Sequence, residues 1–155
     1  MASAPVRLSA PKLDEQLCFA LYSSALAMTK AYRPLLEALG LTYPQYLVMM
    51  VLWEHEAQTV SELGDRLHLD SGTLTPLLKR LETAGLLGRS RDPDDERRVI
   101  VQLSPAGRAL RARAGSLPAR MARLTGCSAT ELAQLRRRLL QLRDAIAEAG
   151  GDDAS

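Results

Sequence analysis

The feature that most constrains the fold is a run of seven apolar residues at positions 47–53. It lies in a segment with helix-start signals, because Thr42 is a good N-cap residue and Pro44 is tolerated in a first turn. We therefore predict a helix over residues 43–55. A helix that is apolar around its whole circumference must be buried on every side. In a chain of 155 residues, this segment is the central helix of the fold or also faces a second subunit.

The composition agrees with one helical globular domain. Apolar residues make up 46% of the chain and charged residues 25%, while aromatic residues make up only 4%, which does not favour an all-β fold. The apolar run is far shorter than the ~20 residues that a membrane-spanning helix needs. No secretory signal is visible near the start, so we expect a cytoplasmic protein.

Metal and disulfide chemistry have little support. Two cysteines, Cys18 and Cys127, do not make a disulfide scaffold, and His55 and His68 are the only histidines, with no short metal-ligand spacing. We predict no metal site and no cofactor. Cytoplasmic cysteines stay reduced unless they carry out redox chemistry.

A helix-turn-helix is predicted directly after the central helix. A short helix over residues 60–67 is followed by a tight turn and by a new helix capped by Asp70 or Ser71. In the new helix, leucines recur with the spacing of one buried helical face, at Leu74, Leu77, Leu78 and Leu81. The other face carries hydroxyl and cationic groups that reach bases and phosphates, at Gly72, Thr73, Pro76, Lys79, Arg80 and Thr83. An ordinary solvated face explains Lys79 and Arg80 equally well, and the net charge of +2 does not by itself indicate nucleic-acid binding.

A β-hairpin is predicted next, from strand candidates at residues 86–91 and 98–103 joined by a turn-rich tip at 92–97. A helix-turn-helix followed by a hairpin is a winged helix. Acidic and basic charges cancel at the tip, so we expect acidic residues there to orient particular arginines, with a salt-bridged surface loop as the alternative.

Long helices are expected on both sides of the winged helix-turn-helix at residues 42–103, which we call the reader. The first covers residues 13–39, with a kink or a split near Pro34 and a stop at Gly40. Another starts at Ser104 and runs to about 124, with an interruption at Pro118. Ser128 opens the last helix, to about 149, with a capping box.

These elements define a mainly α fold with a small β-hairpin. We predict a flexible arm at residues 1–11, one domain at 12–149 and a flexible tail at 150–155. Within the domain, residues 42–103 form the winged helix-turn-helix, and 12–40 and 104–149 form dimerisation helices. A two-fold dimer would present two recognition helices to DNA half-sites roughly 34 Å apart.

Cys18 and Tyr22 lie four residues apart, on one face of the first helix. From the residues alone, Cys18 is a small core hydrophobe or a reactive thiol. The helix places no Lys, Arg or His within one turn on that face, so tyrosine hydroxyls elsewhere would have to support a thiolate. Apolar neighbours would favour organic hydroperoxides over hydrogen peroxide; they are Leu17, Phe19, Leu21 and Met28.

Cys127 precedes the capping residue Ser128, where it could pack on Leu132 as a hydrophobic staple or gain thiolate character from the helix N-terminus.

The string Asp95-Glu96-Arg97-Arg98-Val99, in a winged helix flanked by long helices, resembles the MarR-type regulators. The segments at 16–22 (QLCFALY) and 41–47 (LTYPQYL) resemble the organic hydroperoxide resistance regulators within that family. The resemblance extends over residues 13–149.

The resemblance implies a homodimeric repressor that binds an inverted-repeat operator when reduced and releases it when oxidised. Cys18 matches the peroxide-reactive cysteine, Tyr32 and Tyr43 match tyrosines that reach it from the partner subunit, and Tyr22 matches a tyrosine on its own helix. Cys127 matches the second cysteine of the two-cysteine subgroup, which forms an intersubunit disulfide with the oxidised thiol. The residues that match DNA contacts are Asp70, Ser71, Thr73, Pro76, Lys79 and Arg80 in the recognition helix, and Asp95 and Arg97 in the wing.

Three other functions stay open at this point. A MarR-type repressor could be released by a small phenolic ligand, with both cysteines structural. A thiol peroxidase would leave the winged helix unexplained and lacks an Arg or His beside Cys18, so we do not expect an enzyme. A pure dimerisation or partner-binding module is the third.

Overall fold

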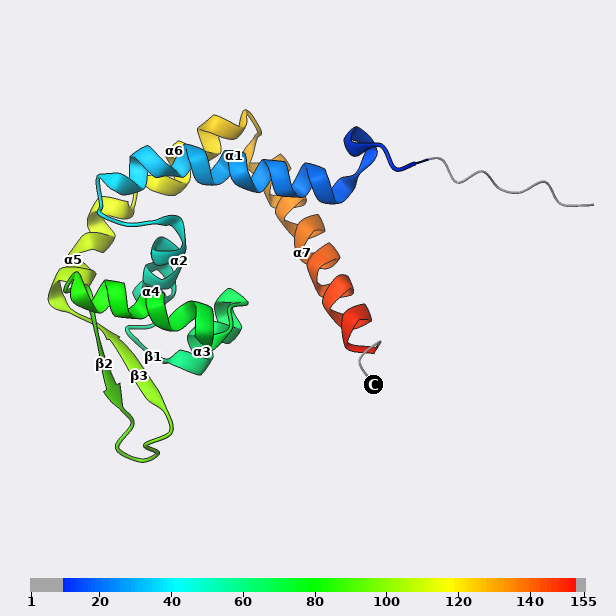
Figure 1. Cartoon of the computed structure of the whole chain (residues 1–155). Coiled ribbons are helices and arrows are strands. Elements are labelled where there is room, and N and C mark those ends of the chain that lie inside the picture. The colour runs from blue at the N-terminus through cyan, green and yellow to red at the C-terminus, as the bar shows by residue number, and fades with distance from the viewer. Residues whose placement is uncertain (1–9, 153–155) are drawn as a thin grey trace, which may run out of the picture. The chain divides into compact units, whose positions relative to one another are not determined.

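The computed structural model describes residues 10–152 of the chain. They divide into two compact units, with the boundary between Leu110 and Arg111. In chain order, the elements are η1 (Leu13–Glu15), α1 (Leu17–Glu37), α2 (Tyr43–Glu54), β1 (Ala57–Thr59), α3 (Val60–Leu67), α4 (Ser71–Thr83), β2 (Leu87–Arg91), β3 (Val99–Leu103), α5 (Pro105–Ala114), α6 (Leu117–Thr125) and α7 (Ala129–Asp152) (Figure 1). The predicted fold class, mainly helical with a winged helix, is confirmed. None of the described helices is long and apolar enough to cross a membrane.

The helix α1 is one continuous helix, so of the predicted kink or split near Pro34 the split is wrong. Pro34 lies on the exposed surface of α1, and the helix continues through it with the loss of a single backbone hydrogen bond, the one to the Lys30 carbonyl. The stop at Gly40 is confirmed, because the Leu41 N–H donates to the Leu36 carbonyl across it (3.1 Å).

The helix α2 is the centre of the first unit, as its apolar sequence predicts. A capping box starts it: Thr42 Oγ1 accepts the Gln45 N–H (3.4 Å), and Gln45 Oε1 accepts the Thr42 N–H (2.9 Å). Its buried side chains are Gln45, Tyr46, Val48, Met49, Val51 and Leu52. Most of the apolar circumference is therefore buried within one chain, while Leu47, Met50 and Trp53 stay half-buried.

The helix-turn-helix has the predicted boundaries. The helix α3 ends at Leu67, its C-cap His68 adopts a left-handed conformation with φ of 55°, and Asp70 is the N-cap of α4. The predicted leucine stripe of α4 is buried: Leu74, Leu77, Leu78 and Leu81.

The wing is part of a three-stranded antiparallel sheet in the order β1-β3-β2. The pairing joins Leu87 to Leu103 and Arg91 to Val99, so the tip spans residues 92–98. Figure 1 shows the β2–β3 hairpin extending past α4. The strand β1 was not predicted, because its three residues form a strand only against β3, more than forty residues later.

The second unit contains α6 and α7. The predicted interruption lies at Gly115 and Ser116 rather than at Pro118, which is tolerated in the first turn of α6. The capping box is confirmed, with the Glu131 N–H on Ser128 Oγ (3.2 Å) and the Ser128 N–H on Glu131 Oε2 (2.7 Å).

The predicted terminal segments are only partly described. Residues 150–152 belong to α7, so the flexible tail does not begin at Gly150, and 153–155 lie outside the described residues. In the predicted arm, residues 1–9 also lie outside them, and Ala10 and Pro11 have no regular structure.

Candidate functional site

The helix α4 and its N-cap carry the recognition-helix residues that the sequence assigns to DNA contacts. Asp70 Oδ1 accepts the Thr73 N–H (2.7 Å), and this backbone hydrogen bond is the main reason that the pKa of Asp70 is lowered. The Asp70 carboxylate therefore accepts a backbone N–H from the first turn of α4 and acts as the N-cap of this helix. The side chains of Ser71, Thr73, Pro76, Lys79 and Arg80 are exposed.

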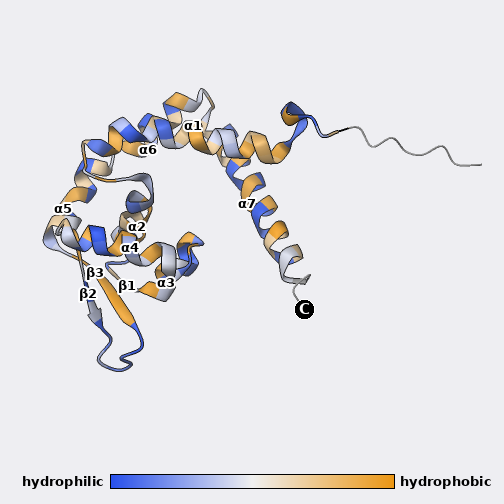
Figure 2. Ribbon diagram, in the orientation of Figure 1, coloured by the Kyte–Doolittle hydropathy of each residue, from blue (hydrophilic) through white to orange (hydrophobic). Residues whose placement is uncertain are grey.

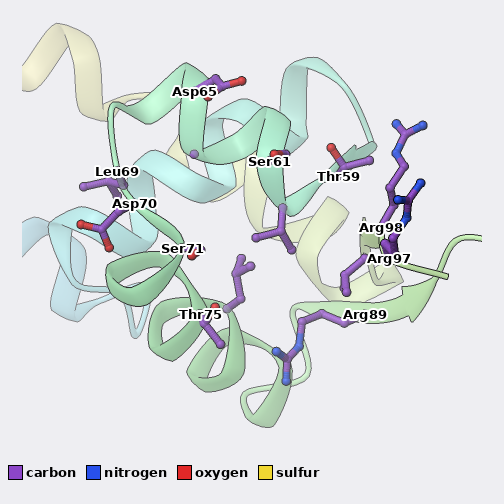
Figure 3. A pocket seen from close by; sticks show the side chains of 14 residues that line it. Thr59, Ser61, Asp65, Leu69, Asp70, Ser71, Thr75, Arg89, Arg97 and Arg98 are labelled. Carbon is purple, nitrogen blue, oxygen red and sulfur yellow. The ribbon is translucent and has the colours of Figure 1, made fainter. Parts of the chain in front are cut away.

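A groove of about 580 Å³ runs beside α4 toward the wing (Figure 3). Its lining combines hydroxyl groups from α3 and α4, at Ser61, Ser71 and Thr75, with guanidinium groups from the hairpin, at Arg89, Arg97 and Arg98. Hydroxyl and guanidinium donors are the groups that bind phosphate oxygens. The predicted list lacks Ser61 and Thr75, since their place in this groove depends on how α3, α4 and the hairpin pack.

At the wing tip, Asp95 and Arg97 form a paired fork. Arg97 Nε donates to Asp95 Oδ1 (3.1 Å) and its Nη2 donates to Oδ2 (3.3 Å), while the Arg97 backbone N–H also reaches Oδ1 (3.1 Å). These bonds from Arg97 lower the pKa of Asp95. The Arg97 side chain is still 91% exposed. The tip therefore contains an acidic–basic pair with an accessible guanidinium, which fits both an oriented arginine and a salt-bridged surface loop.

Arg89 holds the wing to the recognition helix. Its backbone N–H donates to Glu82 Oε2 (2.9 Å), and its guanidinium reaches both oxygens of the same carboxylate (3.4 Å each). The Arg89 side chain also lowers the pKa of Glu82. Sequence reasoning did not single out this pair, because the partners lie on α4 and β2.

Cys18 and Tyr22 are both exposed on α1, so Cys18 is not part of this chain's core. Their helix also exposes large apolar side chains, including Leu17, Phe19 and Leu26. Figure 2 shows such hydrophobic bands along α1 and α7.

Tyr32 and Tyr43 contact each other, with ring centroids 4.8 Å apart, and Tyr46 joins them at 5.9 and 6.3 Å. Burial, followed by the neighbouring tyrosines, raises the pKa of Tyr32 to about 12, and burial raises those of Tyr43 and Tyr46. The three phenols are therefore neutral hydrogen-bond donors at ordinary pH. Tyr46 was missed as a member of this cluster because it directly precedes the apolar run of α2 and was assigned to the helix core.

The tyrosine cluster cannot reach Cys18 of the same chain. Cys18 and Tyr32 lie on one continuous helix, fourteen residues apart, which at 1.5 Å per residue is about 21 Å along the axis. Only Tyr22, one turn away, is close to Cys18 in the sequence of α1. Support from Tyr32 and Tyr43 would have to come from a second chain.

Cys127 lies in the second unit, between α6 and α7, and is exposed. Its backbone N–H donates to Thr125 Oγ1 (3.2 Å), and its thiol donates to the Thr125 carbonyl (3.6 Å). The thiol is thus accessible and oriented by its own turn. Within residues 10–152, no cluster of three or more His, Cys, Asp or Glu side chains could hold a metal ion.

Comparison with known proteins agrees with this geometry. The MarR family model matches residues 41–99. The organic hydroperoxide resistance transcriptional regulator of Bacillus subtilis is 47% identical over 135 residues, which cover 87% of this chain and 92% of the relative. The chain belongs to the MarR family.

Solved structures of this family are similar over most of the chain. Reduced AbfR bound to DNA is 32% identical, with a TM-score of 0.75, and the match covers 88% of this chain and 93% of that one. Disulfide-formed AbfR is 34% identical, with a TM-score of 0.58, over 84% and 91% of the two chains. AbfR is a protein of Staphylococcus epidermidis.

The protein is therefore a MarR-type transcriptional regulator and not an enzyme, which removes the thiol peroxidase alternative. The matched segment, 41–99, contains every residue predicted to contact DNA. Cys18 and Cys127 both lie outside it, Cys18 on α1 and Cys127 in the turn between α6 and α7.

Proposed function

We propose that the protein is a homodimeric, redox-sensing repressor of transcription that acts in the cytoplasm. The reduced dimer binds an inverted-repeat operator, and an organic hydroperoxide releases it by oxidising Cys18. The observation that carries this proposal is the separation of Cys18 from the tyrosine cluster within one chain, about 21 Å along α1. A reactive thiol with tyrosine donors then requires the α1 helices of two chains side by side.

The exposed apolar surface supports the dimer. Among the described residues, the large exposed hydrophobic side chains lie on η1, α1, α6 and α7, outside the reader. Those on α7 are Leu135, Leu139, Leu140 and Ile146. Burial of such faces between two copies would give the proposed dimerisation roles to residues 12–40 and 104–149.

The redox step uses two thiols and one hydroperoxide. The Cys18 thiolate attacks the terminal peroxide oxygen, the O–O bond breaks, and the organic part leaves as an alcohol, so that Cys18 becomes a sulfenic acid. The thiol of Cys127 from the partner subunit then attacks the Cys18 sulfur, an S–S bond forms and water leaves. The hydroperoxide is reduced by two electrons, and the two thiols are oxidised by two. The known reduced, DNA-bound and disulfide forms of AbfR support this sequence.

DNA recognition follows from the groove and the wing. The exposed face of α4 would enter the major groove, with Ser71, Thr73, Pro76, Lys79 and Arg80 near base edges and phosphates and Asp70 holding the helix end. Arg97, oriented by Asp95, would enter the minor groove. Oxidation would shift α1 and thereby change the spacing of the two recognition helices.

The test measures operator binding before and after treatment with an organic hydroperoxide. The probe is an inverted-repeat duplex that the reduced protein selects from a random-sequence pool. We expect wild type to be released, Cys18→Ser to stay bound, and a non-reducing gel to show a covalent dimer that Cys127→Ser does not form. Release of Cys18→Ser at the wild-type dose would exclude the mechanism, and a wild type that remains monomeric on that gel would exclude Cys127 from it.

A second candidate function has one observation in its favour. A cavity of about 230 Å³ lies between the end of α1 and the start of α2, lined among others by Arg33, Leu36, Leu41 and Tyr43. Its size and its cation suit a small phenolic acid. Release of DNA by such an acid from the double variant Cys18→Ser, Cys127→Ser, reduced by Arg33→Gln, would favour a ligand-controlled repressor.

A further inference from the structure

The tyrosine cluster is extended by Trp53, the only tryptophan of the chain. The rings of Tyr46 and Trp53 meet edge to face, with centroids 6.2 Å apart. Trp53 lies in the last turn of α2, and its indole Nε1–H donates to the backbone carbonyl of Gly107 in α5 (2.9 Å). The series of aromatic rings therefore runs from Tyr32 on α1 to Trp53 on α2, and a hydrogen bond connects Trp53 to the first turn of α5.

The hydrogen bonds continue from Gly107 to the recognition helix. The Gly107 N–H donates to Ser104 Oγ (3.1 Å), and the Ser104 hydroxyl donates to the Gly85 carbonyl (2.6 Å). Gly85 ends α4 with a positive φ of 77°, a conformation that glycine adopts without strain. The Ser104 N–H also donates to the Leu86 carbonyl (3.1 Å). Ser104 thus caps α5 and attaches it to the end of α4.

This junction has no free space. A Cβ atom added to Gly107 would lie 2.0 Å from the Leu86 carbonyl oxygen and 3.0 Å from Leu103 Cδ2. The first turn of α5 is therefore packed directly on the backbone that leaves α4. A displacement of α5 relative to α2 would move the end of the recognition helix, because close-packed contacts transmit shifts.

We infer that Trp53 and Ser104 are positioning residues that couple the tyrosine cluster on α1 and α2 to the recognition helix α4. The inference rests on the proposed function, in which the cluster senses the state of Cys18 of the partner subunit. Every member of the path lies on the first unit of one chain. Neither Trp53 nor Ser104 belongs to the residues assigned to DNA contacts or to the redox step.

The path can be tested without oxidant, because coupling between two sites is reciprocal. Binding of the selected operator duplex to reduced protein should change the emission of Trp53, which is the only indole. Ser104→Ala, which removes the hydroxyl link, should bind the duplex and lose that change, and Ser104→Thr should restore it. An emission change of the same size in wild type and Ser104→Ala would overturn the inference.

The second test removes only the indole donor. Trp53→Phe keeps an aromatic ring beside Tyr46, and we expect the reduced variant to bind the duplex within about threefold of wild type. Its thiols should oxidise at the wild-type rate, while the hydroperoxide-induced loss of DNA affinity should shrink by about fivefold or more. Full release of Trp53→Phe, with thermal unfolding like that of wild type, would also overturn the inference.

The two proposals fail in different ways. If hydroperoxide does not release the wild type, the redox function is wrong, and the emission experiment still decides the coupling. If the wild type is released and both variants behave like it, the redox function stands and the path carries no coupling.

Discussion

The reader and the helices that flank it differ in how they use apolar side chains. In α4, the leucines of the inner face are almost fully buried, with Leu74 and Leu78 at 0% exposure. In α7, Leu135 is 53% exposed and Ile146 is 62% exposed, although the helix has the same apolar periodicity. The same sequence pattern is thus satisfied within one chain in the reader and left unsatisfied outside it. This exposure of the α7 stripe in a single chain is what the proposed dimer would explain.

The largest expected effect tests whether the buried leucines of α4 stabilise the reader within a single chain. Leu78→Ala should lower the free energy of unfolding by about 2–5 kcal/mol, since it leaves a cavity in a close-packed site. Ile146→Ala removes a similar side chain from an exposed face and should change dimer dissociation more than the unfolding of the reader. Denaturant unfolding at several protein concentrations measures both. Equal losses for the two variants at every concentration would contradict the comparison.

The next effect tests the need of α7 for a partner. Leu135→Glu places a charge on the proposed dimer face and should weaken dimerisation by about 2–3 kcal/mol, because an unpaired carboxylate is costly to bury. Sedimentation measures the dissociation constant. Gln102→Glu adds the same charge on the exposed side of β3 and should leave the oligomeric state unchanged.

Tyr32 lies on the flanking helix α1 and contacts Tyr43 and Tyr46 on α2 of the reader. Its titration therefore tests whether α1 is packed on the reader in solution. Its pKa is raised to about 12 in the folded chain by burial and by Tyr43 and Tyr46. Because burial disfavours the phenolate, the contribution of the neutral phenol to stability is fully present below pH 10 and is lost as the pH rises toward 12. Unfolding free energies measured across that range should fall less steeply for Tyr32→Phe. Identical slopes would show that the phenol is not buried in solution.

The smallest expected effect compares DNA affinity after removal of an arginine from the wing and after removal of one from α7. Arg97→Ala should weaken operator binding by about 1–2 kcal/mol and lower the salt dependence by about one phosphate contact. Arg143→Ala removes an arginine from α7 that pairs with Asp144 (2.9 Å) and should change neither quantity. Fluorescence anisotropy across a salt series provides the measurement. An equal loss for both variants would extend the DNA surface beyond the reader.

Much of the fold could be predicted because its signals are local. The capping residues Thr42, Asp70 and Ser128 lie next to the helices they start, and a leucine stripe marks the inner face of α4. At Pro34 the sequence left a kink and a split open, and the structure removes only the split, because one lost backbone hydrogen bond does not end α1. The strand β1 was missed because its partner strand is remote in the sequence.

The residues of the candidate site could be predicted only where they belong to one short sequence motif. The wing pair Asp95 and Arg97 lies within three residues, so the sequence contains both partners. The tyrosine Tyr46, the groove hydroxyls and the Glu82–Arg89 pair depend on packing between elements, which no local pattern encodes. The motif resemblance predicted roles for Cys18 and Cys127, and their exposure on separate units is what the structure adds.

The close approach at Gly107 also limits which sequences can keep this architecture. Any L-residue other than glycine would place its Cβ 2.0 Å from the Leu86 carbonyl oxygen, a backbone atom that no rotamer change can move away. A saturation library at position 107 should therefore retain a single amino acid under selection for repression. Neighbouring exposed positions of α5, such as Ala106 and Ala109, should accept many. The contact that attaches α5 to the end of the recognition helix therefore accepts no side chain at position 107 unless the backbone at Leu86 shifts.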